Sequence, residues 1–256
     1  MKRIELQAIL AILLLSGIVA WNTPVPAFAL SSNSLLEQFA RADDIKEKKT
    51  SLEKLQALEP DSAYGHFAKG WLLNLEQRFE EAADEYQEAL RIRNDFPEAH
   101  NGLGNVYYNL DKPDQALAEY QAAAALDPNY IEAQLNIATL HYKESRLDPA
   151  VSAYLAVLRI NPKHAVAQNN LGNIYYQQGK LPQAIRAYQE AVRNNPGLPQ
   201  AHYNLAVALE ETHQAQEALE EYRVFLYLAK EDYPNQAEHA LGRVEELRIK
   251  ISRLRL

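Results

Sequence analysis

The chain contains the segment PEAHNGLGNVYY at residues 97–108 and the similar segment AVAQNNLGNIYY at residues 165–176. Both belong to a pattern with a period of 34 residues, which also governs two series of identical residues. Tyrosine recurs at Tyr86, Tyr120, Tyr154, Tyr188 and Tyr222, and alanine at Ala82, Ala116, Ala150, Ala184 and Ala218. Two series of five with one period are hard to obtain by chance, so the sequence predicts a tandem-repeat architecture.

Each repeat carries two stretches with helical character. In the second stretch apolar residues follow helical spacing, as at Ala116, Tyr120, Ala123 and Leu126. Small residues in the first stretch, such as Gly104, predict close packing of the two helices. Proline after Asp127, Asn161 and Asn195 predicts where second helices end, because a residue before proline avoids the α conformation. One such unit cannot bury its apolar face alone, whereas stacked units can.

The segments at 97–108 and 165–176 resemble the first helix of a tetratricopeptide repeat. The resemblance covers five units, which are residues 63–96, 97–130, 131–164, 165–198 and 199–232. It implies an all-α fold, a right-handed superhelix (α-solenoid) of tandem helix-turn-helix units with a concave inner wall. Residues 30–62 are expected to form a degenerate N-terminal cap repeat and residues 233–256 a C-terminal capping helix. In that helix Leu241, Val244, Leu247, Ile251 and Leu254 are expected to cover the last repeat.

Residues 1–29 differ from the repeats in composition. Lys2 and Arg3 precede an apolar run from Leu6 to Trp21, and the stretch ends at Ala29. This layout predicts a secretory signal peptide, with a short membrane anchor as the alternative, although a helix that spans a bilayer needs roughly 20 apolar residues. We therefore expect an exported protein of the periplasm or another extracytoplasmic compartment, including a thylakoid-type lumen. It would be membrane-anchored if the segment stays uncleaved.

Composition argues against several classes of function. The chain has no cysteine, so disulfides, thiolate metal sites and cysteine nucleophiles are excluded, and its net charge of −8 disfavours nucleic acid. Histidine occupies the fourth place of three repeats at His66, His100 and His202, but Gln134 and Gln168 interrupt this series. We predict no metal, no cofactor and, since no catalytic motif is present, no enzyme activity.

A candidate binding surface follows from the resemblance, which implies that first helices line the inner wall. The predicted peptide-binding residues are Asn101, Asn105, Tyr108, Asn136, Tyr142, Asn169, Asn170, Asn173, Tyr176, Tyr203 and Asn204. Carboxamides donate to and accept from a peptide backbone whatever its sequence, and tyrosines add stacking area. The alternative is that the asparagines only form bonds within their own repeats.

Two further patterns bear on the ligand. Chaperone-docking members of the family hold a terminal carboxylate with lysine and arginine on the inner wall, and residues such as Glu98, Glu132 and Gln200 stand in those places here. Tails of heat-shock chaperones are therefore not expected as ligands.

In the first repeat, Tyr64, Phe67, Trp71 and Leu75 lie along one helix face. They predict either an apolar pocket at the mouth of the groove or a core against the N-terminal cap.

The sequence thus favours a non-catalytic protein-protein interaction scaffold that binds a peptide segment of a client in its groove. Its role would be that of an extracytoplasmic adaptor or a membrane-complex assembly factor. The alternative is a self-associating structural scaffold that pairs through the C-terminal helix or the superhelix edges. Expected partners are a protein or peptide client and no nucleic acid, while membrane proximity through the N-terminus and a homo-oligomer stay open.

Overall fold

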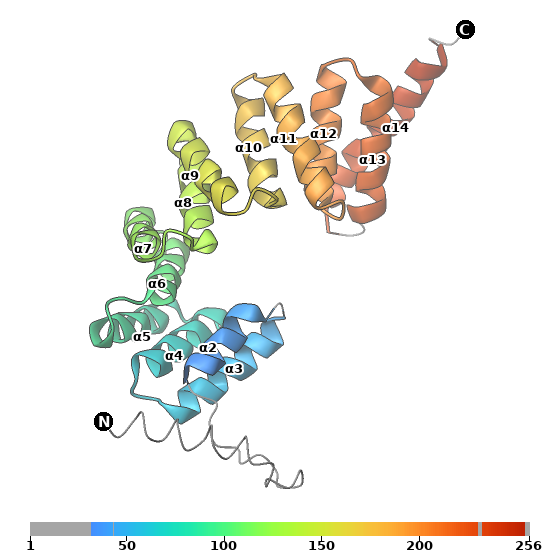
Figure 1. Cartoon of the computed structure of the whole chain (residues 1–256). Coiled ribbons are helices and arrows are strands. Elements are labelled where there is room, and N and C mark those ends of the chain that lie inside the picture. Colours follow the sequence, from blue (N-terminus) through green and yellow to red (C-terminus); the bar gives the residue numbers. More distant parts are fainter. Residues whose placement is uncertain (1–31, 43, 230–231, 254–256) are drawn as a thin grey trace, which may run out of the picture.

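The computed structural model describes residues 32–42, 44–229 and 232–253, and Figure 1 shows them as a curved array of helices. Every regular element in these ranges is a helix, which confirms the all-α class. None of the described helices combines the length and the apolar character that crossing a membrane requires. The predicted signal peptide at residues 1–29 lies outside the described residues.

The helices pack in consecutive pairs. They are α2 (Ser32–Arg41), α3 (Ile45–Leu58), α4 (Ala63–Leu75), α5 (Phe79–Ile92), α6 (Pro97–Asn109), α7 (Pro113–Leu126), α8 (Ile131–Lys143), α9 (Leu147–Ile160), α10 (Ala165–Gln177), α11 (Leu181–Asn194), α12 (Pro199–Glu211), α13 (Ala215–Ala229) and α14 (Pro234–Arg253). The pairs from α4–α5 to α12–α13 are called repeats 1 to 5 below. The first helices of neighbouring repeats contact one another more closely than the second helices do. Examples are α4 with α6 and α10 with α12. The first helices therefore form the inner side of the curve.

The turn inside each repeat has one conformation regardless of its sequence. Its central residue has a positive φ of 56° to 69° in all five repeats, at Gln77, Asp111, Ser145, Gly179 and His213. This left-handed conformation lets the next backbone N–H return to the first helix, as Lys180 does to the Tyr175 carbonyl at 2.8 Å. Glycine is predicted for such a position, but only repeat 4 uses it.

The turns between repeats are closed by the residues before proline. Asp127, Asn161 and Asn195 lie outside the α conformation and end α7, α9 and α11, as predicted. Each side chain also accepts a hydrogen bond from the backbone N–H two residues later, at 2.9 to 3.0 Å. The side chain thus satisfies a backbone donor that the helix end leaves free.

The tyrosine series forms the core between the two helices of each repeat. The rings of Tyr86, Tyr120, Tyr154, Tyr188 and Tyr222 are at most 3% exposed. A Cβ atom on Gly104 would lie 2.6 Å from the Tyr120 ring, and one on Gly172 would lie 2.5 Å from the Tyr188 ring. The small residues of the first helices are therefore required by the tyrosine that packs against them.

The apolar face of α4 predicted in repeat 1 belongs to the core, with one exception. Phe67 is 2% exposed, and the Phe39 ring from α2 meets the rings of Phe67 and Trp71 edge-on at 5.9 and 5.6 Å. Of the two predictions for this helix face, packing against the N-terminal cap is the one that the structure shows. Leu75, at the end of the face, is 41% exposed.

The capping helix α14 buries a narrower stripe than predicted. Ala240 and Leu247 are buried against α13, and Val244 and Ile251 are partly buried, whereas Leu241 is 60% exposed. Successive helical residues differ by about 100° in direction, so Leu241 lies beside the stripe rather than on it. Its prediction as a covering residue was wrong, and Leu254 lies outside the described residues.

The hydroxyls of the core tyrosines differ in their hydrogen-bond partners, and the hydroxyl of repeat 1 has none among the described residues. Tyr120 and Tyr188 donate to Asn105 and Asn173 at the ninth place of the same repeat, both at 2.9 Å. In repeat 1 that place holds Trp71, and the buried Tyr86 hydroxyl has no hydrogen-bond partner among the described residues. A buried hydroxyl without a partner lowers stability.

Replacing tyrosine by phenylalanine should therefore have opposite consequences in the two repeats. Tyr120→Phe removes a hydrogen bond and should lower the free energy of unfolding by about 1 kcal/mol. Tyr86→Phe removes an unpartnered hydroxyl and should leave stability unchanged or raise it. Urea denaturation monitored by circular dichroism measures both, and an equal loss in the two variants would contradict this account of the core.

Candidate functional site

Asparagines of the inner wall join repeat 2 to repeat 3. The Asn136 amide nitrogen donates to the side-chain oxygens of Asn101, at 2.9 Å, and Asn105, at 3.2 Å. Asn105 also accepts from the Tyr120 hydroxyl. The prediction left open whether these asparagines bind a peptide or bond within their own repeats. In the structure they bond across the junction between two repeats.

The same arrangement recurs between repeats 4 and 5. Asn204 donates to Asn169 and Asn173, both at 3.0 Å, and Tyr188 donates to Asn173. Asn101 and Asn169 are only 8% and 6% exposed. Their burial leaves little surface for contact with a ligand, so they support the more exposed asparagine of the next repeat.

The junction between repeats 3 and 4 is built differently. Leu135 and Thr139 stand where repeats 2 and 4 have asparagine. The Asn170 amide therefore donates to the Tyr154 hydroxyl, at 3.2 Å, and this hydroxyl also lies 3.3 Å from the Thr139 Oγ1. Fewer amides meet here than at the other two junctions.

A row of hydrogen bonds follows the edge of the inner wall from repeat to repeat. Three of the four predicted binding tyrosines bond to the residue 35 positions later. Tyr108 accepts from Lys143, Tyr142 accepts from Gln177 at 2.7 Å, and Tyr176 donates to Glu211. The Lys143 ammonium also lies over the Tyr108 ring, 4.6 Å from its centre. These tyrosines connect repeats as well as facing the groove.

A hollow of about 500 Å³ opens on the inner wall where repeats 3, 4 and 5 meet α14. Its lining residues are Tyr142, Asn173, Tyr176, Gln177, Tyr188, Tyr203, Asn204, Val207 and His239. Five of the predicted binding residues are among them, from three different repeats. The structure thus brings Tyr142, Asn173, Tyr176, Tyr203 and Asn204 together around one cavity. Whether they bind a peptide stays a prediction.

The other predicted residues lie elsewhere on the wall. Asn101, Asn105, Tyr108 and Asn136 belong to the junction of repeats 2 and 3, and Asn169 and Asn170 lie beside the hollow without lining it. The candidate site is therefore confined to the C-terminal half of the groove.

Four lining residues were not predicted. Gln177 and Val207 stand at places that line the inner wall in the family, so the resemblance could have predicted them. Tyr188 belongs to the core series, so only its buried position was foreseen. His239 lies on α14 outside the repeat pattern, and its Nδ1 lies 3.1 Å from the Tyr203 hydroxyl. No sequence signal places α14 at this edge.

The hollow is polar but carries no fixed charge. Lysine, arginine, aspartate and glutamate are absent from its nine lining residues. Burial raises the pKa of the Tyr142 and Tyr203 hydroxyls, and burial followed by the bond to Glu211 raises the pKa of Tyr176 to about 12. The tyrosines therefore stay protonated donors at neutral pH. Such a lining suits an uncharged ligand with apolar area and backbone amides.

The histidines at the fourth place of the repeats pair with glutamate instead of converging on a metal. His66, His100 and His202 each place Nδ1 2.6 to 2.7 Å from a carboxylate 19 residues later, of Glu85, Glu119 and Glu221. Where the fourth place holds Gln134 or Gln168, the position 19 residues later is alanine. No group of three potential metal ligands gathers among the described residues.

In repeat 5 this pair also joins two repeats. The His202 Nε2 lies 3.0 Å from the Pro196 carbonyl of the preceding repeat, while Nδ1 faces Glu221. Both nitrogens face acceptors, so both bonds form only when the ring is protonated. Burial alone would lower the pKa of His202, but the bonds to Glu221 and to the Pro196 carbonyl outweigh it and raise that pKa. Gln168 makes the equivalent bond to the Pro162 carbonyl, at 2.9 Å, without a titrating group.

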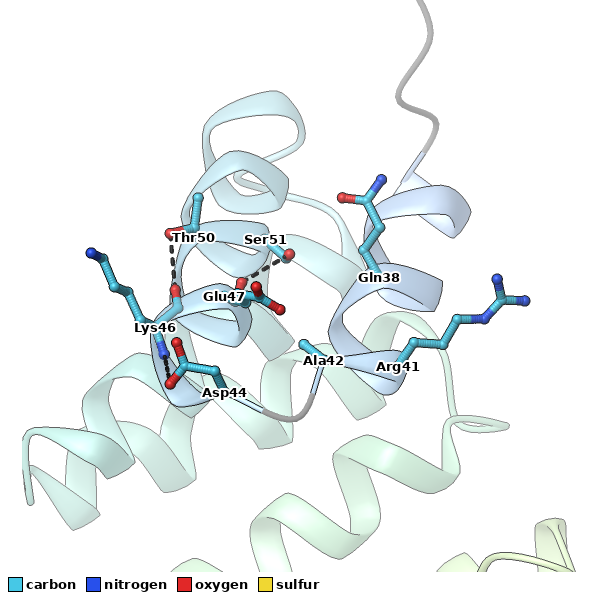
Figure 2. A pocket seen from close by; sticks show the side chains of 8 residues that line it. All are labelled: Gln38, Arg41, Ala42, Asp44, Lys46, Glu47, Thr50 and Ser51. Carbon is cyan, nitrogen blue, oxygen red and sulfur yellow. Dashed lines mark hydrogen bonds between the residues drawn. The ribbon is translucent and has the colours of Figure 1, made fainter.

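A larger hollow of about 650 Å³ lies between α2 and α3, and Figure 2 shows its lining. Its polar groups serve the helices themselves, since Asp44 accepts from the Lys46 backbone and Thr50 donates to the Lys46 carbonyl. Arg41 and Lys46 point in opposite directions. We place the candidate site on the inner wall, where residues of three repeats and α14 line one hollow.

Comparison with family models matches the repeats directly. A model described as TPR repeat matches residues 70–111, 140–179 and 172–212, and one described as tetratricopeptide repeat matches residues 97–130. The matches span more than half of the chain. It is a tetratricopeptide-repeat protein. No curated protein sequence matches this tetratricopeptide-repeat chain significantly.

Solved structures show the same fold. The chain is 23% identical to MamA from Desulfovibrio magneticus RS-1, with a TM-score of 0.59 over 66% of this chain and 95% of that one. It is 21% identical to PilF from Pseudomonas aeruginosa, with a TM-score of 0.60 over 75% and 91%. It is also 20% identical to YrrB, described as having an unusual peptide-binding site, with a TM-score of 0.57 over 75% and 97%. At these identities the likeness concerns the fold of tetratricopeptide-repeat proteins.

The His202 pair of this tetratricopeptide-repeat chain should make stability depend on pH. Its folded pKa is raised above the ordinary value of about 6.5, so the stabilisation is complete below that pH and is lost as pH rises through the folded value. Converting the pair to the repeat 4 arrangement, His202→Gln with Glu221→Ala, should therefore cost more stability in acid. We expect a loss on the order of 1 kcal/mol, as for one charged hydrogen bond, at about pH 5.5 and little at about pH 8.5. Urea denaturation at both pH values tests this, and a loss independent of pH would refute it.

Proposed function

We propose that this tetratricopeptide-repeat protein is a non-catalytic scaffold that binds an extended peptide segment of a client protein at the hollow between repeats 3 to 5 and α14. The observation that carries the proposal is the lining of that hollow. Four tyrosines, two asparagines and a glutamine line it, and no lysine, arginine, aspartate or glutamate is among the lining residues.

This lining matches the needs of an extended peptide. A peptide backbone offers alternating donors and acceptors, which carboxamides can satisfy in either direction. Tyrosine rings supply contact area and need few torsions to be ordered, so little entropy is lost on binding. The fold is shared with YrrB, a protein described as having an unusual peptide-binding site, which supports peptide binding as a use of this fold.

The cellular role is proposed from the sequence alone. The charge and apolar pattern of residues 1–29 supports export, either with cleavage or with membrane attachment. We infer an extracytoplasmic adaptor or a membrane-complex assembly factor whose client reaches the groove in that compartment. The assignment includes no catalytic step.

The two equivalent asparagines of the groove offer a matched test of the binding site. Asn136 and Asn204 make the same pair of hydrogen bonds to the preceding repeat, but only Asn204 lines the hollow. Alanine at either position should therefore lower stability by a similar amount, about 1 kcal/mol. Only Asn204→Ala should also weaken peptide binding, by about 0.5–1.5 kcal/mol.

Peptides selected from a displayed random library on the full chain can serve as ligands, with affinity measured by fluorescence anisotropy. Equal losses of affinity in Asn136→Ala and Asn204→Ala would show that the effect comes from stability. An unchanged affinity in Asn204→Ala would remove this residue from the site.

Self-association is a second candidate function, and the exposed apolar residues at the C-terminal end favour it. Leu241 is 60% exposed and Ile249 44% exposed on α14, and Tyr227 of α13 is 83% exposed. Burying these side chains between two copies would contribute favourably through the hydrophobic effect.

Light scattering of the full chain at several concentrations tests this alternative. If copies pair through α14, the average mass rises with concentration and Leu241→Asp returns it to that of a monomer. A rise that Leu241→Asp leaves unchanged would place the contact elsewhere, and a constant monomer mass would exclude the alternative.

A further inference from the structure

At one position in the described helices, no contact within the chain requires glycine. In Gly65, Gly70, Gly102, Gly104 and Gly172 an added Cβ atom would come within 3.1 Å of another part of the chain. A Cβ atom on Gly242, in the middle of α14, would meet nothing within 4 Å. Glycine is unfavourable inside a helix, so at this position its cost is not offset by any contact that the structure shows.

Gly242 lies on the side of α14 that faces the groove. Asn235, His239, Gly242 and Glu246 follow the spacing of one helix face, and His239 contacts the Tyr203 hydroxyl of the inner wall. These four residues, with Glu238 and Arg243, line a hollow of about 460 Å³. His239 also lines the tyrosine-rich hollow, so the two cavities adjoin at this residue.

The charge of this second hollow differs from that of the first. Its lining contains Glu238 and Glu246 and one cation, Arg243. The Arg243 guanidinium donates to both Glu210 and Glu246, so one cation is shared by two carboxylates and neutralises Glu246 only in part. Glu238 is exposed and forms no ion pair with any described residue. The surface around Gly242 is therefore acidic, whereas the tyrosine-rich hollow is neutral.

We propose that α14 is a second binding wall, on which an extended client segment crosses Gly242 and presents a lysine or arginine to Glu238 and Glu246. The same segment places an uncharged side chain in the tyrosine-rich hollow next to it. A glycine without a side chain lets the client backbone approach the helix closely, and the carboxylates complement a basic residue. This inference rests on the proposed function and specifies the chemistry of the client.

The experiment compares variants of the full chain in selections from a displayed random peptide library. Wild type should enrich peptides with an aromatic or aliphatic residue beside a lysine or arginine. The double reversal Glu238→Lys with Glu246→Lys should lose the basic preference and bind a selected peptide about five- to tenfold more weakly, as expected from two exposed ion pairs. Gly242→Trp should block the wall and weaken the same peptide.

Two control variants separate binding from folding. Glu217→Lys with Glu220→Lys makes the same change of charge on exposed residues of α13, a second helix away from the inner wall, and should keep the preference of wild type. Gly242→Ala adds a methyl group where nothing would touch it and should raise the melting temperature, which shows that α14 tolerates substitution at this position. The melting temperature of Gly242→Trp is measured alongside.

The outcomes distinguish the two proposals. Enrichment of uncharged residues without a basic neighbour, or a basic preference that survives the reversal, would overturn the inference and leave the peptide-binding proposal standing. An equal loss from Glu217→Lys with Glu220→Lys would show a general charge effect and would also overturn it. No enrichment of any peptide by wild type would overturn the proposed function itself.

Discussion

The structure depends on one contact in each repeat, in which a buried tyrosine ring lies against a residue with little or no side chain. Tyr120 against Gly104 and Tyr188 against Gly172 set how closely the two helices approach, because even a single added carbon would overlap the ring. The ring fills the space between helices, and its hydroxyl emerges toward the inner wall. Packing and groove chemistry are thus joined in one side chain.

The tyrosine hydroxyl also positions the asparagine side chains of the groove. Where the ninth place holds asparagine, the tyrosine holds the carboxamide, which then accepts from an asparagine of the next repeat. This happens at two of the junctions and produces the same cluster twice. The tyrosine-rich hollow lies at the junction of repeats 4 and 5, where α14 closes the groove with His239.

Most of the fold could be predicted because a single period repeats the same requirement five times. The helix pairs, the buried tyrosines and the ends before proline all follow from residues that recur every 34 positions. Side-chain pairing was harder, since the asparagines looked like free groups until their partners across the junction were known. The pairing of His202 with Glu221 did leave a signal, because alanine replaces glutamate wherever glutamine replaces histidine. Leu241 and His239 lie outside the repeat, where only the actual direction of α14 decides what is exposed.

The turn inside each repeat has a consequence for engineering. Four different side chains, from Gln77 to His213, adopt a backbone conformation that glycine alone takes without strain, at a cost on the order of 1 kcal/mol each. Part of that strain is offset because glycine loses more freedom when a chain folds. The hydrogen bonds of the turn, rather than its residue type, hold the conformation. These loops are therefore places where thermal tolerance could be adjusted without altering any residue that lines the tyrosine-rich hollow.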